Sequence, residues 1–81
     1  ESMYQLVGGR VEALEFIIRG ETDYTNIPLK ELPTKANNLI ACIGRGRSII
    51  IPNGNDVLKV GDSVVVVTTE PRVQDITDIM V

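Results

Sequence analysis

The stretch that decides the fold is GRGRSIIIPNGNDVLKVGDSVVVVTT, which runs from Gly44 to Thr69. It holds two aliphatic runs, Ile49–Ile51 and Val64–Val67, separated by a segment rich in Pro, Gly, Asn and Asp. β-Branched residues favour strands, whereas those four residue types favour turns. The stretch therefore predicts two strands, and Pro52 should end the first because proline cannot donate a hydrogen bond to a neighbouring strand.

The glycines of this stretch predict three turns. Gly44–Arg47 joins two predicted strands that are only a few residues apart, so it should form a tight hairpin in which glycine supplies a positive φ. Asn53–Gly54 is among the strongest hairpin signals, and we expect Gly54 to have a positive φ as well. Gly61–Asp62 predicts a third turn just before the valine run. Each of these residues has a structural role that needs no ligand.

Further strands are predicted upstream. In Val11–Ile18, the alternate residues Leu14, Phe16 and Ile18 share one apolar face, as expected for a strand that covers a core. The predicted strands are Val11–Ile18, Asn38–Gly44, Ser48–Ile51 and Ser63–Thr69.

Two helices are predicted between and after these strands. Asn26 can cap a short helix, which should have two turns at most because Pro33 disfavours helical geometry at Leu32. Near the end of the chain, Val73, Ile76 and Met80 recur at i, i+3 and i+7, which predicts an amphipathic C-terminal helix of about three turns. The expected fold class is therefore α+β: a small, largely antiparallel sheet of about four strands, with a short helix after the first strand and a C-terminal helix. Residues 1–10 are predicted to be a linker or tail, and residues 11–81 the domain.

Composition excludes several classes of protein. With 81 residues the chain forms one domain at most. The net charge of −3 provides no basic field for a nucleic acid. The longest apolar run is far shorter than the roughly 20 residues of a membrane span, which predicts no membrane insertion. The single cysteine, Cys42, cannot form an internal disulfide. A cytoplasmic location is the simplest interpretation.

The sequence also argues against an enzyme. It has no histidine, the most common general base and metal ligand. Cys42 lies in an apolar strand with no base nearby in the sequence, which is typical of a buried inert thiol. Ser48 and Ser63 begin strands and lie in no nucleophile motif. We therefore predict neither a catalytic residue nor a metal site.

Arg45 and Arg47 are not required by a hairpin. Two residues apart in an extended chain, they should point to the same side and form a small cationic spot on an acidic domain. This spot is either a solvated hairpin tip or a site for an anion such as a phosphate.

Considered together, these segments resemble the C-terminal domain of the TrkA family, also called the RCK C-terminal domain. The resemblance covers residues 10–81 and is carried by Ile27–Leu32, Ile43–Gly46, Ile49–Gly54, Asp56–Leu58 and Val60–Val67. It implies a cytosolic regulatory module of a potassium uptake system, peripheral to the membrane through a transporter subunit that the full-length protein contacts. The family module usually follows a Rossmann-type domain that binds a nucleotide such as NAD or ATP, and we expect neither that domain nor a cofactor site within these 81 residues.

The resemblance also suggests a site for a nucleotide-like effector. In branches that bind cyclic di-AMP, an apolar pair corresponds to Leu39 and Ile40, and an arginine corresponds to Arg45; with Arg47, these are the predicted ligand-binding residues. The acidic and amide positions of that motif fall on Ile43 and Ile51, whose side chains cannot hydrogen-bond a base or a ribose. This departure argues against cyclic di-AMP and leaves open another effector, or none.

The aliphatic runs predict a homodimer. Consecutive apolar residues on a strand face opposite sides, so both faces of these strands are apolar. The predicted helices can cover one face, and a second copy is the nearest cover for the other. The chain is then either a ligand-sensing dimerisation module, with Arg45 and Arg47 at a cavity, or a purely structural assembly domain, with both arginines in solvent.

Overall fold

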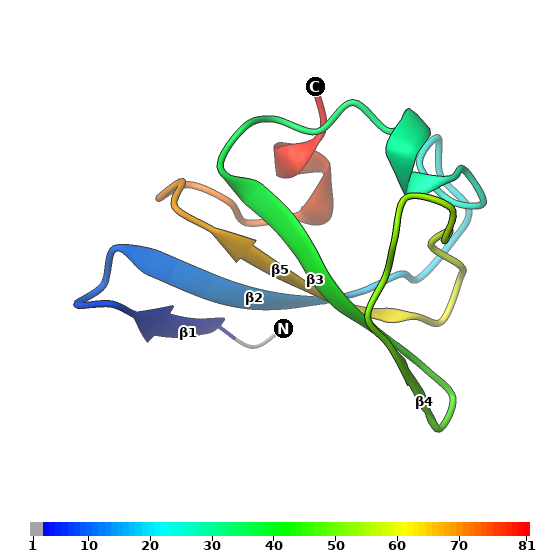
Figure 1. The fold of residues 1–81 in the computed structure, drawn as a ribbon, viewed down its shortest axis with the longest axis horizontal. Helices are drawn as coiled ribbons and strands as arrows, with labels where there is room; N and C mark the ends of the chain where they lie inside the picture. Colours follow the sequence, from blue (N-terminus) through cyan, green and yellow to red (C-terminus); the bar gives the residue numbers. More distant parts are fainter. Residues whose placement is uncertain (1–2) are drawn as a thin grey trace.

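The computed structural model describes residues 3–81, which form one antiparallel sheet of five strands (Figure 1). The strands are β1 (Met3–Leu6), β2 (Val11–Ile17), β3 (Asn38–Arg45), β4 (Ser48–Ile50) and β5 (Ser63–Thr68). Their order across the sheet is β1-β2-β5-β3-β4, so the valine-rich β5 lies at the centre. The helical elements among the described residues are two short 3₁₀ helices, η1 (Leu29–Glu31) and η2 (Ile76–Ile79).

The four predicted strands are confirmed as β2, β3, β4 and β5. The hairpin between β3 and β4 is confirmed too: Arg45 pairs with Ser48, and Gly46 in the turn has a φ of 59°. Gly61, with a φ of 93°, forms the predicted turn before β5. These elements could be predicted locally because aliphatic runs favour strands, and because glycine is the residue that most readily adopts the positive φ of a tight turn.

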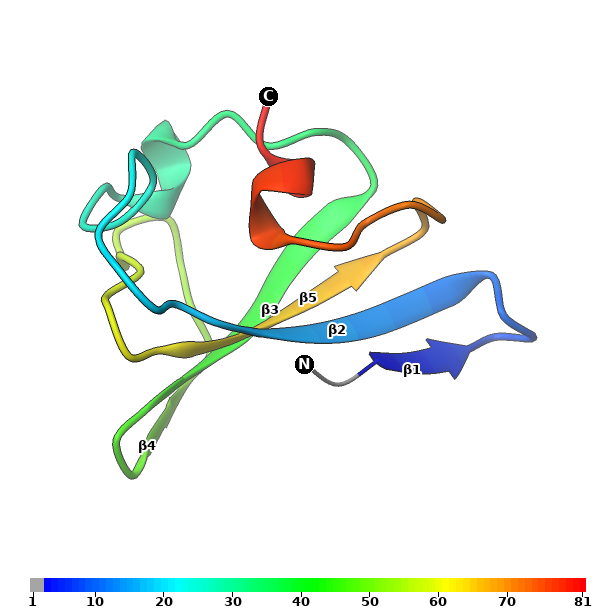
Figure 2. The same cartoon turned by 180° about the vertical axis from the view of Figure 1, so that it is seen from behind.

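One face of the sheet, the closed face, carries the core. Buried side chains of β2, β3 and β5 meet those of η2, of the loop before β5, and of two residues just outside these elements, Ile18 after β2 and Val73 before η2. The cluster comprises Leu14, Phe16, Ile18, Ile43, Leu58, Val64, Val66, Val73, Ile76 and Ile79. Leu29 of η1 packs against the edge of this cluster. Figures 1 and 2 show η1 and η2 on the same side of the sheet.

The opposite face of the sheet, the open face, has no such cover among residues 3–81. Strand pairing places these side chains on it: Tyr4, Leu6, Val11, Ala13, Glu15, Ile17, Leu39, Cys42, Ile49, Ser63, Val65 and Val67. The alternation along β5 follows from this, because Val64 and Val66 are fully buried whereas Val65 and Val67 are only half-buried.

The predicted α+β class is wrong, because the C-terminal amphipathic helix is a single 3₁₀ turn. Asp75 is extended, with φ −141° and ψ 156°, and forms a reciprocal capping box with Asp78, so the helix begins only at Ile76. It ends at once because the backbone beyond it pairs with residues 33–35: Lys35 N–H donates to Ile79 O and Val81 N–H to Pro33 O, both at 2.7 Å. The two buried residues of η2, Ile76 and Ile79, are three apart, which suits three residues per turn.

The short helix after the first predicted strand is also reduced to one 3₁₀ turn, η1. Asn26 does not cap it: the residue before the helix is Pro28, which makes no side-chain capping bond. Leu32 is extended, as expected of a residue before proline. The structure also adds β1, within residues 1–10, to the sheet. Residues 1–2 of the predicted linker or tail lie outside the described residues, and the predicted domain boundary stays a prediction.

Gly54 departs from the hairpin prediction in an informative way. Its φ is not positive, and the strands on either side of its loop, β4 and β5, are not neighbours in the sheet. The loop instead supports η1, because Lys30 N–H donates to Gly54 O at 2.9 Å and Leu29 N–H to Asp56 O at 2.9 Å. A Cβ at Gly54 would lie 2.9 Å from Lys30 Cβ, so glycine is needed for close packing rather than for a left-handed turn.

Candidate functional site

Arg45, the first predicted ligand contact, is turned toward its own domain. Its Nε donates to Asp62 Oδ1 at 2.9 Å, and its Nη2 donates to Asp62 Oδ2 and to Val57 O, both at 2.8 Å. Asp62 is 1% exposed and also accepts the Lys59 N–H at 2.8 Å. The hydrogen bonds from Arg45 hold the pKa of Asp62 below its ordinary value, and those to Asp62 raise the pKa of Arg45. The arginine therefore fastens the end of β3 to the loop before β5.

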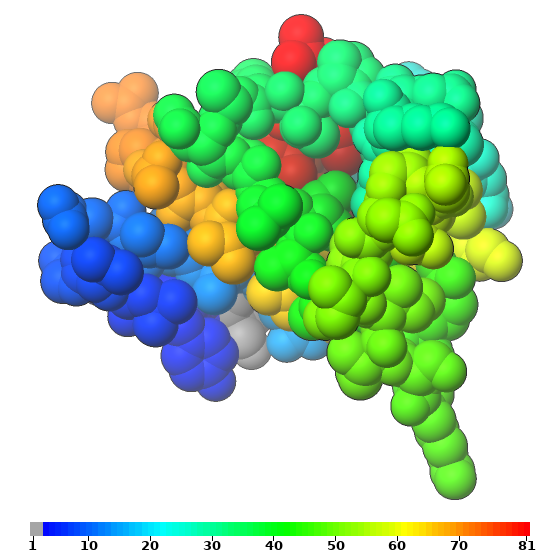
Figure 3. All heavy atoms as spheres, in the orientation of Figure 1, coloured from blue at the N-terminus to red at the C-terminus, as the bar shows by residue number. Residues whose placement is uncertain are grey.

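Arg47 lies at the turn of the β3–β4 hairpin and is exposed. Figure 3 shows this hairpin projecting from the body of the molecule. The predicted cationic spot is therefore divided within one chain, since one guanidinium binds an internal carboxylate while the other stands at an exposed tip. Sequence spacing placed both on one side of a strand but could not reveal the carboxylate of Asp62, 17 residues away from Arg45.

Leu39 and Ile40, the predicted apolar pair, are successive residues of β3 and point to opposite faces. Leu39 is 62% exposed on the open face, whereas Ile40 is half-buried against the core. Both nevertheless border a cavity of about 260 Å³ between β3, η1 and the Gly54 loop, here called the η1 cavity. Its lining comprises Leu29, Lys30, Thr34, Asn38, Leu39, Ile40, Pro52, Asn53, Gly54 and Ile79.

The η1 cavity combines apolar walls with a few polar groups, as small-molecule sites do. Lys30 is its only charged lining residue. Asn38 donates through Nδ2 to Ala36 O at 3.0 Å and to Lys35 O at 3.3 Å, whereas its buried Oδ1 has no hydrogen-bond partner. A ligand with an apolar ring and an anionic group matches the apolar walls and Lys30 chemically. The structure thus brings Leu39 and Ile40 to a cavity and leaves Arg45 and Arg47 outside its lining.

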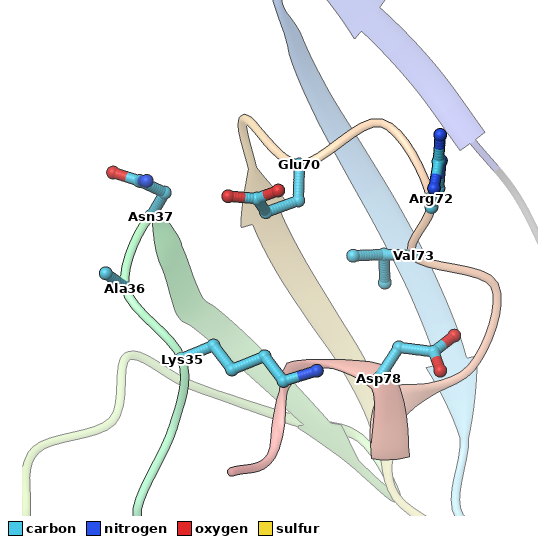
Figure 4. A pocket seen from close by; sticks show the side chains of 7 residues that line it. All are labelled: Lys35, Ala36, Asn37, Glu70, Arg72, Val73 and Asp78. Atoms are coloured by element: carbon cyan, nitrogen blue, oxygen red, sulfur yellow. The ribbon is translucent and has the colours of Figure 1, made fainter.

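A hollow larger than the η1 cavity was not predicted from the sequence. It measures about 430 Å³ and is lined by Lys35, Ala36, Asn37, Glu70, Arg72, Val73 and Asp78 (Figure 4). Its charges are mixed, and Asp78 already accepts the backbone N–H groups of Gln74 and Asp75, which lower its pKa. The lining comes from three separate segments, so no local motif could indicate it.

Within residues 3–81 there is no cluster of three or more His, Cys, Asp or Glu side chains suited to a metal ion. Over the same residues, no helix is long and apolar enough to cross a membrane. The features left to explain function are the η1 cavity and the open face.

Comparison with known protein families shows which family the chain belongs to. A sequence model of the TrkA-C domain matches residues 14–81. The chain belongs to the TrkA-C domain family. The resemblance inferred over residues 10–81 is thereby confirmed for residues 14–81. The TrkA-C match includes β3, β4, β5, both 3₁₀ helices and most of β2, whereas β1 precedes it.

A curated relative of this TrkA-C domain is the Trk system potassium uptake protein TrkA homolog 2 of Methanosarcina mazei. The two are 29% identical over 72 residues, which is 89% of this chain but only 16% of the relative. The chain therefore spans about one sixth of the length of the relative it matches.

Proposed function

We propose that this TrkA-C domain is a cytoplasmic regulatory module of a potassium uptake system, and that it pairs with a second copy and senses a small ligand. Family membership and the likeness to a Trk system protein support the regulatory and potassium uptake roles. Under this proposal the rest of the protein supplies a Rossmann-type domain for NAD or ATP and contacts a membrane transporter subunit. The module stays at the membrane surface through that contact.

The observation that carries the pairing is the open face. Five of its large apolar side chains, Tyr4, Leu6, Ile17, Leu39 and Ile49, are between 38% and 73% exposed. If a fully exposed large side chain has an accessible area of about 200 Å², these five expose on the order of 600 Å² of apolar surface per copy. This area is close to the roughly 800 Å² that each partner buries in a standard interface. A contiguous apolar patch of this size marks an interaction surface.

A second copy fits this face better than a charged partner does. The strand residues of the open face include one carboxylate, Glu15, and no lysine or arginine. Two copies therefore bring together surfaces that are almost neutral and similarly apolar. Two-fold pairing, in which one patch faces itself, is the most common symmetry among oligomers.

We place the ligand in the η1 cavity. Leu39 and Ile40 border it, and Lys30 supplies a positive charge. Arg45 and Arg47 remain proposed ligand contacts. Neither lines the η1 cavity of its own chain, so we propose that they contact a ligand that is bound between two copies. Leu39 supports this arrangement because it belongs both to the cavity lining and to the open face.

Thermal melting in the presence of ATP, NAD or cyclic di-AMP tests the ligand site. A ligand that binds only the folded domain raises the melting temperature. We expect Lys30→Met, which keeps the side-chain stem and removes the charge, to abolish this rise. Lys35→Met is the matched control, because Lys35 lines the other hollow.

Loss of the rise in the Lys35 variant instead would move the site to the larger hollow. No rise with any of the three nucleotides would favour the alternative function, a purely structural assembly domain without a ligand. Both functions require pairing, which sedimentation equilibrium measures directly.

A further inference from the structure

The only carboxylate on the strands of the open face stands near the middle of an apolar surface. Glu15 lies on β2 between Ala13 and Ile17 of the same face, and its cross-strand neighbour is Val65 of the central strand β5. The Ser63 hydroxyl donates a hydrogen bond to Glu15 Oε2. The strand pairing thus surrounds one ionisable group with aliphatic side chains.

No lysine or arginine stands at an open-face position of the five strands, and the basic residues nearest to Glu15 along the chain, Arg10 and Arg19, lie beyond the two ends of β2. The other titratable side chains at open-face strand positions are Tyr4 on β1 and Cys42 on β3, and β4 and β5 contribute none. Glu12, also on β2, lies on the opposite face. A partner that covers the open face therefore removes Glu15 from water with the Ser63 hydroxyl as its only side-chain hydrogen-bond donor among residues 3–81.

We propose that Glu15 limits the strength of pairing through the open face. This inference rests on the pairing proposed above. Burying a carboxylate without a cation is unfavourable, and a second copy brings another Glu15 rather than a positive charge. Replacing the carboxylate by a neutral side chain removes both the cost of burying the charge and the repulsion between the two copies of Glu15, so it should strengthen pairing. Glu15 thereby keeps an otherwise apolar interface reversible.

The variants Glu15→Gln and Glu12→Gln, compared by sedimentation equilibrium, test this role. Glu15→Gln keeps the side-chain shape and an oxygen that can accept from Ser63, but removes the charge. We expect its dimer dissociation constant to fall by about tenfold or more at neutral pH. Glu12→Gln removes the same charge from the other face of the same strand and should leave the constant unchanged. Circular dichroism of each variant confirms that the domain is folded.

The outcomes separate this inference from the pairing itself. A parent dimer that Leu39→Asp disrupts but Glu15→Gln leaves unchanged would overturn the role of Glu15 and keep the pairing. A parent monomer that becomes a dimer in Glu15→Gln would support the role of Glu15 as a limiting charge. Folded monomers in both, at every concentration tested, would overturn the pairing and this inference together.

Discussion

Arg45 and Asp62, which are 17 residues apart in the sequence, form a two-point ion pair at 2.8 and 2.9 Å that joins the end of β3 to the loop before β5. The carboxylate is almost fully buried and the arginine side chain is 34% exposed. A fork-shaped guanidinium matches a carboxylate in this geometry, and lysine would not replace it. The pair explains why Arg45 follows Gly44 at the end of β3, where the hairpin itself does not require a particular side chain.

Asp62→Asn should destabilise the domain. The substitution leaves Arg45 without its counter-ion and removes the charge that faces the Lys59 N–H. We expect a loss of about 1–3 kcal/mol in the free energy of unfolding, less than the 3–5 of a fully buried pair because a third of Arg45 meets water. Denaturant titration measures it, with the exposed Asp23→Asn as control. Equal stability of the two variants would contradict a structural role for the pair.

The same pair predicts a dependence of stability on acid. The folded-state pKa of Asp62 is lowered, first by the hydrogen bonds from Arg45. Between the unfolded and folded pKa values the unfolded chain binds more protons, so the contribution of Asp62 is complete above about pH 5 and is lost as the pH falls below about 4. Unfolding free energies measured from neutral pH to about pH 2 should fall less steeply in Asp62→Asn than in the parent. The unfolding free energy of Asp62→Asn should still fall somewhat with falling pH, because the pKa of Asp78 is lowered too. An unchanged slope would contradict this assignment.

Gly54→Ala should destabilise the domain by about 1 kcal/mol or more, because overpacking forces neighbouring atoms apart. The new Cβ would meet the base of the Lys30 side chain at 2.9 Å, and η1 would have to move. Gly20→Ala is the matched control, since nothing lies within 4 Å of a Cβ there and its φ is not positive. Chemical denaturation of both variants is the measurement. If Gly54→Ala were as stable as the control, the close contact between the loop and η1 would be wrong.

The limits of sequence-based prediction are clearest at the C-terminus. Val73, Ile76 and Met80 fit a helical period, but Ile79 is fully buried whereas Met80 is only half-buried. The deciding contacts are the backbone hydrogen bonds to residues 33–35, which no local pattern contains. Strands β2, β3, β4 and β5 were predictable because alternation and aliphatic runs are local signals, whereas β1 was missed because residues 1–10 were expected to be a linker or tail.

The candidate site was predictable only in part. Leu39 and Ile40 were predicted as ligand contacts through the family resemblance; both border the η1 cavity, and their role stays a prediction. Lys30 and Asn38 could not be found, because their place at the cavity depends on how η1 and the Gly54 loop pack against β3. The internal partner of Arg45 was missed for the same reason, since Asp62 is distant in sequence and lies in a turn.

Pairing through the open face is tested most directly by sedimentation equilibrium of the parent and of Leu39→Asp at micromolar concentrations. The parent should have about twice the chain mass of 8.9 kDa. Leu39→Asp places a charge on the open face and should sediment as a folded monomer. Val60→Asp, which changes an exposed valine in the turn before β5, should remain a dimer. A folded parent monomer, or equal dimerisation of the parent and Leu39→Asp, would contradict the interface.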